Sequence, residues 1–134
     1  MNNKNLKIGE LGEQFVRELL VKKNWNIIDY RWRCLWGEID IIAQENASNI
    51  ICFIEVKTRN IFNIDRQGID SITIKKQEKI IKSAESFLSK NPQLANNIFR
   101  FDVALVSYTS INNIALDKIN FQLEHYIKSA FELD

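Results

Sequence analysis

Acidic side chains interrupt two apolar segments in the middle of the chain. The first segment reads Gly37-Glu38-Ile39-Asp40-Ile41-Ile42, and the second reads Ile51-Cys52-Phe53-Ile54-Glu55-Val56-Lys57. Because successive side chains of a β-strand point to opposite faces of the sheet, alternate residues of each segment share a face. The charged residues predicted to lie on one face of each strand are Glu38, Asp40, Glu55 and Lys57.

The turn between the two segments decides which residues lie opposite each other. A turn of two or four residues centred between Asn46 and Ala47 would place Asp40 opposite Phe53. Glu38 would then lie opposite Glu55, with all four charged groups on the same side of the sheet. A three-residue turn would shift the register by one and put Asp40 and Glu55 on opposite faces.

Two carboxylates placed in this way need a compensating charge. Side chains on adjacent strands stand about 5 Å apart, and at an effective dielectric constant near 20 two such charges repel by about 3 kcal/mol. Protonation of one acid or neutralisation by Lys57 would relieve the repulsion, but a hard divalent cation suits oxygen ligands best. We expect Asp40 and Glu55 to bind Mg²⁺ or Mn²⁺. Lys57 would orient a bound water or stabilise developing charge, which predicts phosphodiester hydrolysis.

Two alternatives to this chemistry stay open. Glu38 is either a further ligand or a strand-end residue that pairs with Arg33 or Lys57. Asp40, Glu55 and Lys57 could instead form a buried salt-bridge cluster, although desolvation costs several kcal/mol per ion and makes such clusters rare without a function.

The helix expected before these strands carries a third acid. Apolar residues recur at helical spacing from residue 6 to about residue 24, where Asn24 can end the helix. On a helical projection Glu13 lies about 20° from Leu20, which is on the buried face. We therefore expect Glu13 at the edge of the buried face, where it could serve the same site.

The remaining elements predict an α/β fold in the order αβββαββ(α), a central mixed sheet flanked by helices. Strands are expected at residues 25–33, 38–43 and 49–58, forming an antiparallel meander with a turn at 45–48. An amphipathic helix is expected from about residue 70 to 90, followed by strands at 100–108 and near 114–121 and a short terminal helix. We expect Asp102 to be structural, paired with Arg100 or a helix end.

Charge is segregated along a chain whose net charge is only +1. Residues 37–56 contain four acidic and no basic side chains, while residues 57–90 contain eight basic and four acidic ones. The helix stripe of Lys75, Lys79 and Lys82 is either a solvated face or a track for a phosphate backbone. The residues we expect to contact nucleic acid are Arg33, Lys75, Lys76 and Lys79.

Aromatic residues near the basic ones allow a second kind of contact. Trp25, Trp32 and Trp36 interleave with Arg31 and Arg33, an arrangement suited to stacking on unpaired bases. Core packing or a dimer contact is the alternative for the same tryptophans.

Length and composition limit the class of protein. The 134 residues fit a single domain spanning the whole chain, and no apolar stretch is long enough for a membrane span. Cys34 and Cys52 form no zinc-binding pair, and the sole histidine, His125, cannot form a histidine-based site. We therefore expect a soluble, cytoplasmic protein.

A family resemblance covers nearly the whole chain. The sequence resembles the YraN-like uncharacterised family in six ordered motifs: Gly9-Glu10-x-Gly12-Glu13, Arg31-Trp32-Arg33, Gly37-Glu38-Ile39-Asp40, Glu55-Val56-Lys57-x-Arg59, Ile72-Thr73-x-Lys75-Lys76-Gln77 and Arg100-Phe101-Asp102-Val103. That family is similar to the restriction-endonuclease-like PD-(D/E)xK superfamily, which includes archaeal Holliday-junction resolvases. The resemblance implies a restriction-endonuclease-like fold and a metal-dependent site formed by Glu13, Asp40, Glu55 and Lys57, with Glu13 as a further metal contact.

These expectations lead to one favoured function and two others. The favoured one is a metal-dependent endonuclease on branched or structured DNA, the branched substrate being implied by the resemblance to resolvases. A nucleic-acid-binding or scaffolding module that keeps the nuclease fold without efficient turnover is the second. A cation-stabilised structural domain with a protein partner is the third. A homodimer would double the basic surface and match two-fold symmetric DNA.

Overall fold

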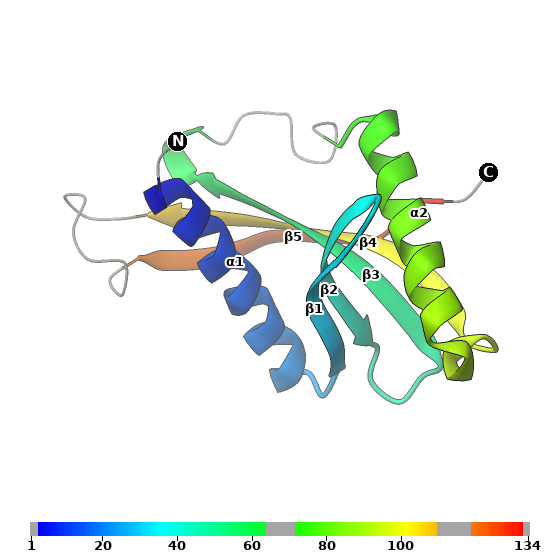
Figure 1. The fold of residues 1–134 in the computed structure, drawn as a ribbon. Coiled ribbons are helices and arrows are strands. Elements are labelled where there is room, and N and C mark those ends of the chain that lie inside the picture. Colours follow the sequence, from blue (N-terminus) through cyan, green and yellow to red (C-terminus); the bar gives the residue numbers. More distant parts are fainter. Residues whose placement is uncertain (1–2, 64–71, 110–118, 133–134) are drawn as a thin grey trace.

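The computed structural model describes residues 3–63, 72–109 and 119–132. Two helices and five strands make up most of this part of the chain (Figure 1). Short 3₁₀ turns lie at Ile61–Asn63 and Pro92–Leu94. The elements in chain order are α1 (Asn3–Lys22), β1 (Asn26–Cys34), β2 (Gly37–Gln44), β3 (Ile50–Asn60), α2 (Ile74–Lys90), β4 (Ile98–Thr109) and β5 (Asn120–Phe131).

The strands form one mixed sheet in the order β1-β2-β3-β4-β5. Neighbouring strands are antiparallel except β3 and β4, which are parallel. Parallel strands need a long crossover connection, and α2 lies in the segment that joins them. The predicted α/β class, the mixed sheet and the antiparallel meander of the first three strands are therefore confirmed. None of the helices formed by these residues has the length and apolar character needed to cross a membrane.

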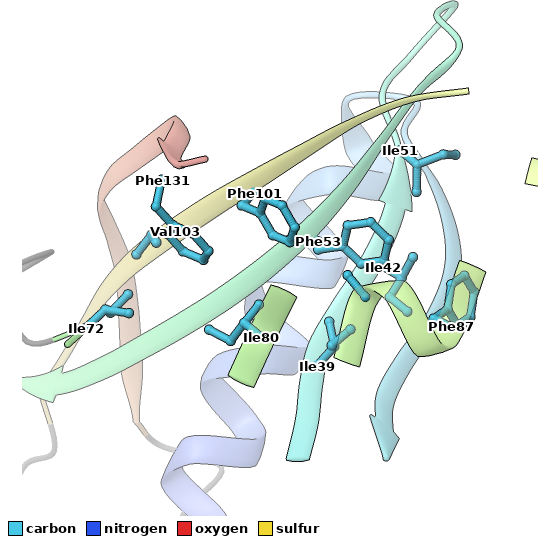
Figure 2. Packing of buried hydrophobic residues seen from close by; sticks show 11 residues of the cluster. Ile39, Ile42, Ile51, Phe53, Ile72, Ile80, Phe87, Phe101, Val103 and Phe131 are labelled. Carbon is cyan, nitrogen blue, oxygen red and sulfur yellow. The ribbon is translucent and has the colours of Figure 1, made fainter. Parts of the chain in front are cut away.

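The two helices cover opposite faces of the sheet. On one face Ile80, Ala84 and Phe87 of α2 pack into a cluster with Phe53 and the apolar residues around it (Figure 2). Phe53 and Phe87 meet edge to face with ring centroids 6.2 Å apart. On the other face Val16 and Leu20 of α1 pack against β2, β3 and β4. Both helices contact the β1–β2 hairpin, which lies between them in Figure 1.

The end of α1 follows from its sequence. Asn24 adopts a positive φ of 66°, and the Trp25 N–H donates to the Leu20 carbonyl, as expected where an αL residue ends a helix.

The packing of α1 on the sheet requires a glycine at residue 12, because a Cβ on Gly12 would lie 2.1 Å from Thr58 Oγ1. The backbone of α1 at Gly12 therefore lies directly against the Thr58 side chain of β3.

The last strand corrects the predicted C-terminal part. Residues 120–131 form one strand, so the short terminal helix is wrong and the final strand lies later than residues 114–121. Residues 110–118 of that prediction lie outside the described part. The start of α2 also differs: it begins at Ile74, where the Thr73 side chain accepts a hydrogen bond from the Lys76 N–H, whereas residues 70 and 71 are outside the described part.

Buried hydrogen bonds connect β5 to β4. Asp102 is fully buried and accepts hydrogen bonds from Arg100, from the Tyr126 hydroxyl at 2.7 Å and from the Ser129 N–H. The predicted pairing of Asp102 with Arg100 is confirmed. Tyr126 and Ser129 belong to β5, so their hydrogen bonds to Asp102 help to keep this segment paired with β4 as a strand.

Candidate acidic site between β2 and β3

The observed register differs from the predicted one by two residues. Ile42 lies opposite Phe53 and Ile41 opposite Ile54, so continuing the register places Asp40 level with Glu55. A shift of two residues keeps Ile42 and Phe53 on one face and Ile41 and Ile54 on the other. The turn is displaced by one residue, since the Glu45 N–H donates to the Ile50 carbonyl at 3.1 Å.

At the acidic residues the backbones of β2 and β3 no longer pair directly. The paired positions run from Gln44 and Ile51 to Ile41 and Ile54. Beyond them the Val56 N–H donates to Asp40 Oδ2 at 2.8 Å. The carboxylate of Asp40 thus takes the place of a backbone acceptor where the two strands part.

A cavity of about 250 Å³ lies at this parting. The Lys76 ammonium of α2 lies 3.4 Å from Glu55 Oε1. Carboxylates from both strands therefore share one cavity with an ammonium group from a helix. Its lining residues are Trp36, Gly37, Glu38, Asp40, Glu55, Lys76, Lys79, Ile80 and Ser83.

Glu13 and Lys57 line a neighbouring cavity of about 450 Å³. Glu13 lies at the edge of the buried face as predicted, with 16% of its side chain exposed. Within the described part of the chain its buried Oε1 atom has no hydrogen-bond partner, and the nearest cation is Arg31 at 3.8 Å. The four residues that the sequence predicts for catalysis are thus divided between two cavities.

Burial and mutual repulsion disfavour the charged carboxylates. Burial, followed by the charge of Glu55, raises the pKa of Asp40 well above its ordinary value. Burial raises the pKa of Glu13 to about 7, with Glu38 and Glu55 adding to the shift and Arg31 opposing it. A bound cation would stabilise both carboxylates in their ionised form.

The two lysines of the site differ in the direction of their pKa shift. Burial, followed by the neighbouring Lys76, lowers the pKa of Lys57 to about 8. Burial alone would lower the pKa of Lys76. A hydrogen bond with Lys57 and the negative charges of Glu55 and Asp40 outweigh burial, so the pKa of Lys76 is raised. Lys76 is therefore the cation that compensates the acids, and Lys57 releases its proton more readily.

Sequence reasoning missed the central role of Arg31. Its guanidinium lies 3.0 Å from Glu10, 3.3 Å from Glu38 and 3.8 Å from Glu13. Arg33 lies 3.8 Å from Glu38, so of the two cationic partners considered for Glu38 the structure places Arg33 beside it. The alternating Arg31-Trp32-Arg33 segment was a signal, but the pairing of Arg31 with α1 depends on how the helix crosses the strand.

The predicted nucleic-acid residues take different positions. Arg33, Lys75 and Lys79 are exposed, with Arg33 beside Glu38 and Lys79 lining the acidic cavity. Lys76 lines the acidic cavity and pairs with Glu55, with 42% of its side chain exposed. The three tryptophans lie in three different surroundings.

The carboxylate oxygens at this site are chemically suited to a hard divalent cation. Asp40 and Glu55 offer carboxylate oxygens, the ligands that Mg²⁺ and Mn²⁺ prefer, and the unpartnered Oε1 of Glu13 lies nearby. Among residues 3–63, 72–109 and 119–132, no three His, Cys, Asp or Glu side chains are grouped so that they could hold a metal ion.

Comparison with known proteins extends the resemblance. The model of "Uncharacterised protein family UPF0102" matches residues 12–106, which include every predicted site residue. The chain is 46% identical over 134 residues to a UPF0102 protein of Nostoc sp. (strain PCC 7120), covering 96% of each. It is 39% identical over 127 residues to one of Thermosynechococcus vestitus, covering 95% of each. The chain therefore belongs to the uncharacterised protein family UPF0102, as its YraN-like motifs predicted.

Proposed function

We propose that this protein is a divalent-cation-dependent nuclease that hydrolyses phosphodiester bonds, with a restriction-endonuclease-like fold. The observation that carries the proposal is the meeting of Asp40 and Glu55 in one cavity, beside Lys76, where β2 and β3 part. Burying two acids in this way is costly unless a cation or a reaction uses them.

Each residue of the site has a distinct task in this proposal. Asp40 and Glu55 would hold the cation, and Glu13 would contact it from the neighbouring cavity. Once bound, the cation would polarise the scissile phosphate and acidify a bound water. Lys57 orients the attacking water or stabilises the charge that develops on the phosphate.

Basic side chains around the cavity favour a polyanionic substrate. Lys79 reaches the cavity from α2, and the exposed Arg33 and Lys75 add positive charge. Phosphate contacts of this kind position a nucleic acid without reading its sequence. We propose branched or structured DNA as substrate because of the resemblance to resolvases, with a homodimer as the arrangement that would present two such surfaces.

Cleavage of a labelled panel tests the proposal. The panel contains duplex, single-strand, flap and four-way-junction DNA, each with Mg²⁺, Mn²⁺ or EDTA. We expect cation-dependent cutting by the natural chain and none by Asp40→Ala or Lys57→Ala. Equal cutting by all three proteins, or cutting that persists in EDTA, would contradict the proposal.

The Lys76–Glu55 ion pair favours a second candidate, a nucleic-acid-binding module without efficient turnover. An ammonium at 3.4 Å already neutralises one of the two carboxylates. In that case all three proteins would bind DNA equally, and none would cleave any member of the panel in either cation.

A further inference from the structure

Trp36 differs from the other two tryptophans in its surroundings. Trp25 packs against the cluster that α1 forms with the sheet. Trp32 packs against the cluster that α2 forms with the sheet, with its ring centroid 5.3 Å from that of Phe87. Trp36 is 45% exposed and lines the acidic cavity together with Asp40 and Glu55. It is therefore the tryptophan placed to contact a molecule that enters this cavity.

The turn that carries Trp36 is anchored at its base. Cys34 and Gly37 are a paired position of β1 and β2, so Leu35 and Trp36 form a two-residue turn. Gly37 has a φ of 142°, a conformation that side chains rarely adopt. The Cys34 thiol donates to Ser83 Oγ of α2 at 3.4 Å, which fixes the turn beside the helix.

The indole contacts one lysine and lines the same cavity as another. The Lys82 ammonium lies over the ring of Trp36, 4.5 Å from its centroid. Lys79 lines the same cavity, and Arg33 is exposed one residue before the paired base of the turn. A flat apolar ring among cations complements a nucleobase joined to a phosphate backbone.

We propose that Trp36 stacks on an unpaired base of the DNA strand whose phosphate enters the acidic cavity. This inference rests on the function proposed for that cavity. A base held in a duplex is covered on both faces by its neighbours, so an exposed indole selects a base that has left the stack. The platform thus adds a preference for single-stranded or branched DNA next to the point of cleavage.

Binding in EDTA tests the platform without relying on cleavage. The probes are a labelled oligodeoxythymidine and a labelled hairpin duplex, titrated with the natural chain, Trp36→Ala, Trp36→Phe and Tyr30→Ala. Tyr30 is a matched control because it is 51% exposed and carries Arg17 over its ring at 4.0 Å, yet lies outside the cavity lining. Thermal unfolding of each variant checks that the fold is kept.

We expect Trp36→Ala to weaken binding of the single strand by about 5- to 150-fold, with duplex affinity unchanged. Trp36→Phe should retain most of the affinity, and Tyr30→Ala should bind like the natural chain. An unchanged single-strand affinity of Trp36→Ala overturns the inference even if the chain cleaves DNA. Equal losses for single strand and duplex, or no single-strand binding by the natural chain, also overturn it.

Discussion

The carboxylate of Asp40 accepts a hydrogen bond of 2.8 Å from the backbone N–H of Val56, beyond the last paired residues of β2 and β3. One oxygen of Asp40 therefore supports the parting of the strands, and the acid as a whole lines the cavity formed there. Asp40 therefore has a structural role in addition to its proposed chemical one. A substitution that tests the chemistry must leave the Val56 N–H with an acceptor.

Asp40→Asn should keep the fold while removing cation-dependent activity. An amide oxygen can still accept from the Val56 N–H, and loss of a buried charge relieves repulsion by Glu55. Asp40→Ala leaves that N–H without its acceptor and should lower the free energy of unfolding by about 1–3 kcal/mol. Urea unfolding and cleavage assays on both variants check this. An Asn variant that cleaves like the natural chain would contradict the assigned role.

Glu13→Gln should stabilise the cation-free protein in a pH-dependent way. Burial raises the pKa of Glu13 from its ordinary value of 4.5 to about 7 in the folded state, so its favourable contribution to stability is complete below pH 4.5 and disappears as the pH rises through 7. Gln does not titrate, so the stability difference should grow from pH 4 to pH 8, reaching at most about 3 kcal/mol. Urea unfolding in EDTA across this range measures it. A difference that is constant with pH would refute the buried, uncompensated state of Glu13.

Lys76→Ala should strengthen binding of a divalent cation. The Lys76 ammonium lies 3.4 Å from Glu55 Oε1 and competes for that carboxylate. Lys75→Ala is the matched control, because it removes the same charge from an exposed neighbouring position. The measurement is the rise in melting temperature during a Mn²⁺ titration. The competition would be disproved if both variants gained the same affinity or if Lys76→Ala gained none.

Gly12→Ala should destabilise the fold and disturb the site. The new Cβ would lie 2.1 Å from Thr58 Oγ1 and 3.1 Å from Thr58 Cβ, and overpacking of this kind costs about 1–3 kcal/mol. Gly9→Ala is the control, since nothing lies within 4 Å of its Cβ and alanine favours the helix by about 1 kcal/mol. Thermal unfolding compares them. Similar stabilities for the two variants would show that α1 does not need this close approach.

Local patterns in the sequence predicted the parts of the fold that depend on local chemistry. Asn24 ends α1 as predicted, and the apolar face of α2 lies on the core. The register of β2 and β3 was wrong by two residues because four-residue turns at neighbouring positions suit the same polar segment. The terminal helix was wrong because partners distant in sequence, Asp102 with Tyr126 and Ser129, hold that segment as a strand.

The sequence predicted where the acidic residues of the candidate site lie, but not which cations pair with them. Alternation along the strands put Asp40 and Glu55 on one face, and a shift of two residues could not change that. The position of Arg31 among three carboxylates and the pairing of Lys76 with Glu55 depend on how α1 and α2 cross the sheet. Strand periodicity carries no information about those crossings.

The rate of cleavage by Glu55→Gln is the sharpest test of whether the acidic cavity is a catalytic site. The natural chain and the variant, purified side by side, are given the same four-way junction in Mn²⁺, so that any contaminating nuclease acts equally in both. We predict clear cleavage by the natural chain and only background by the variant, while both bind the junction in EDTA. Equal cleavage rates for the two proteins would contradict it.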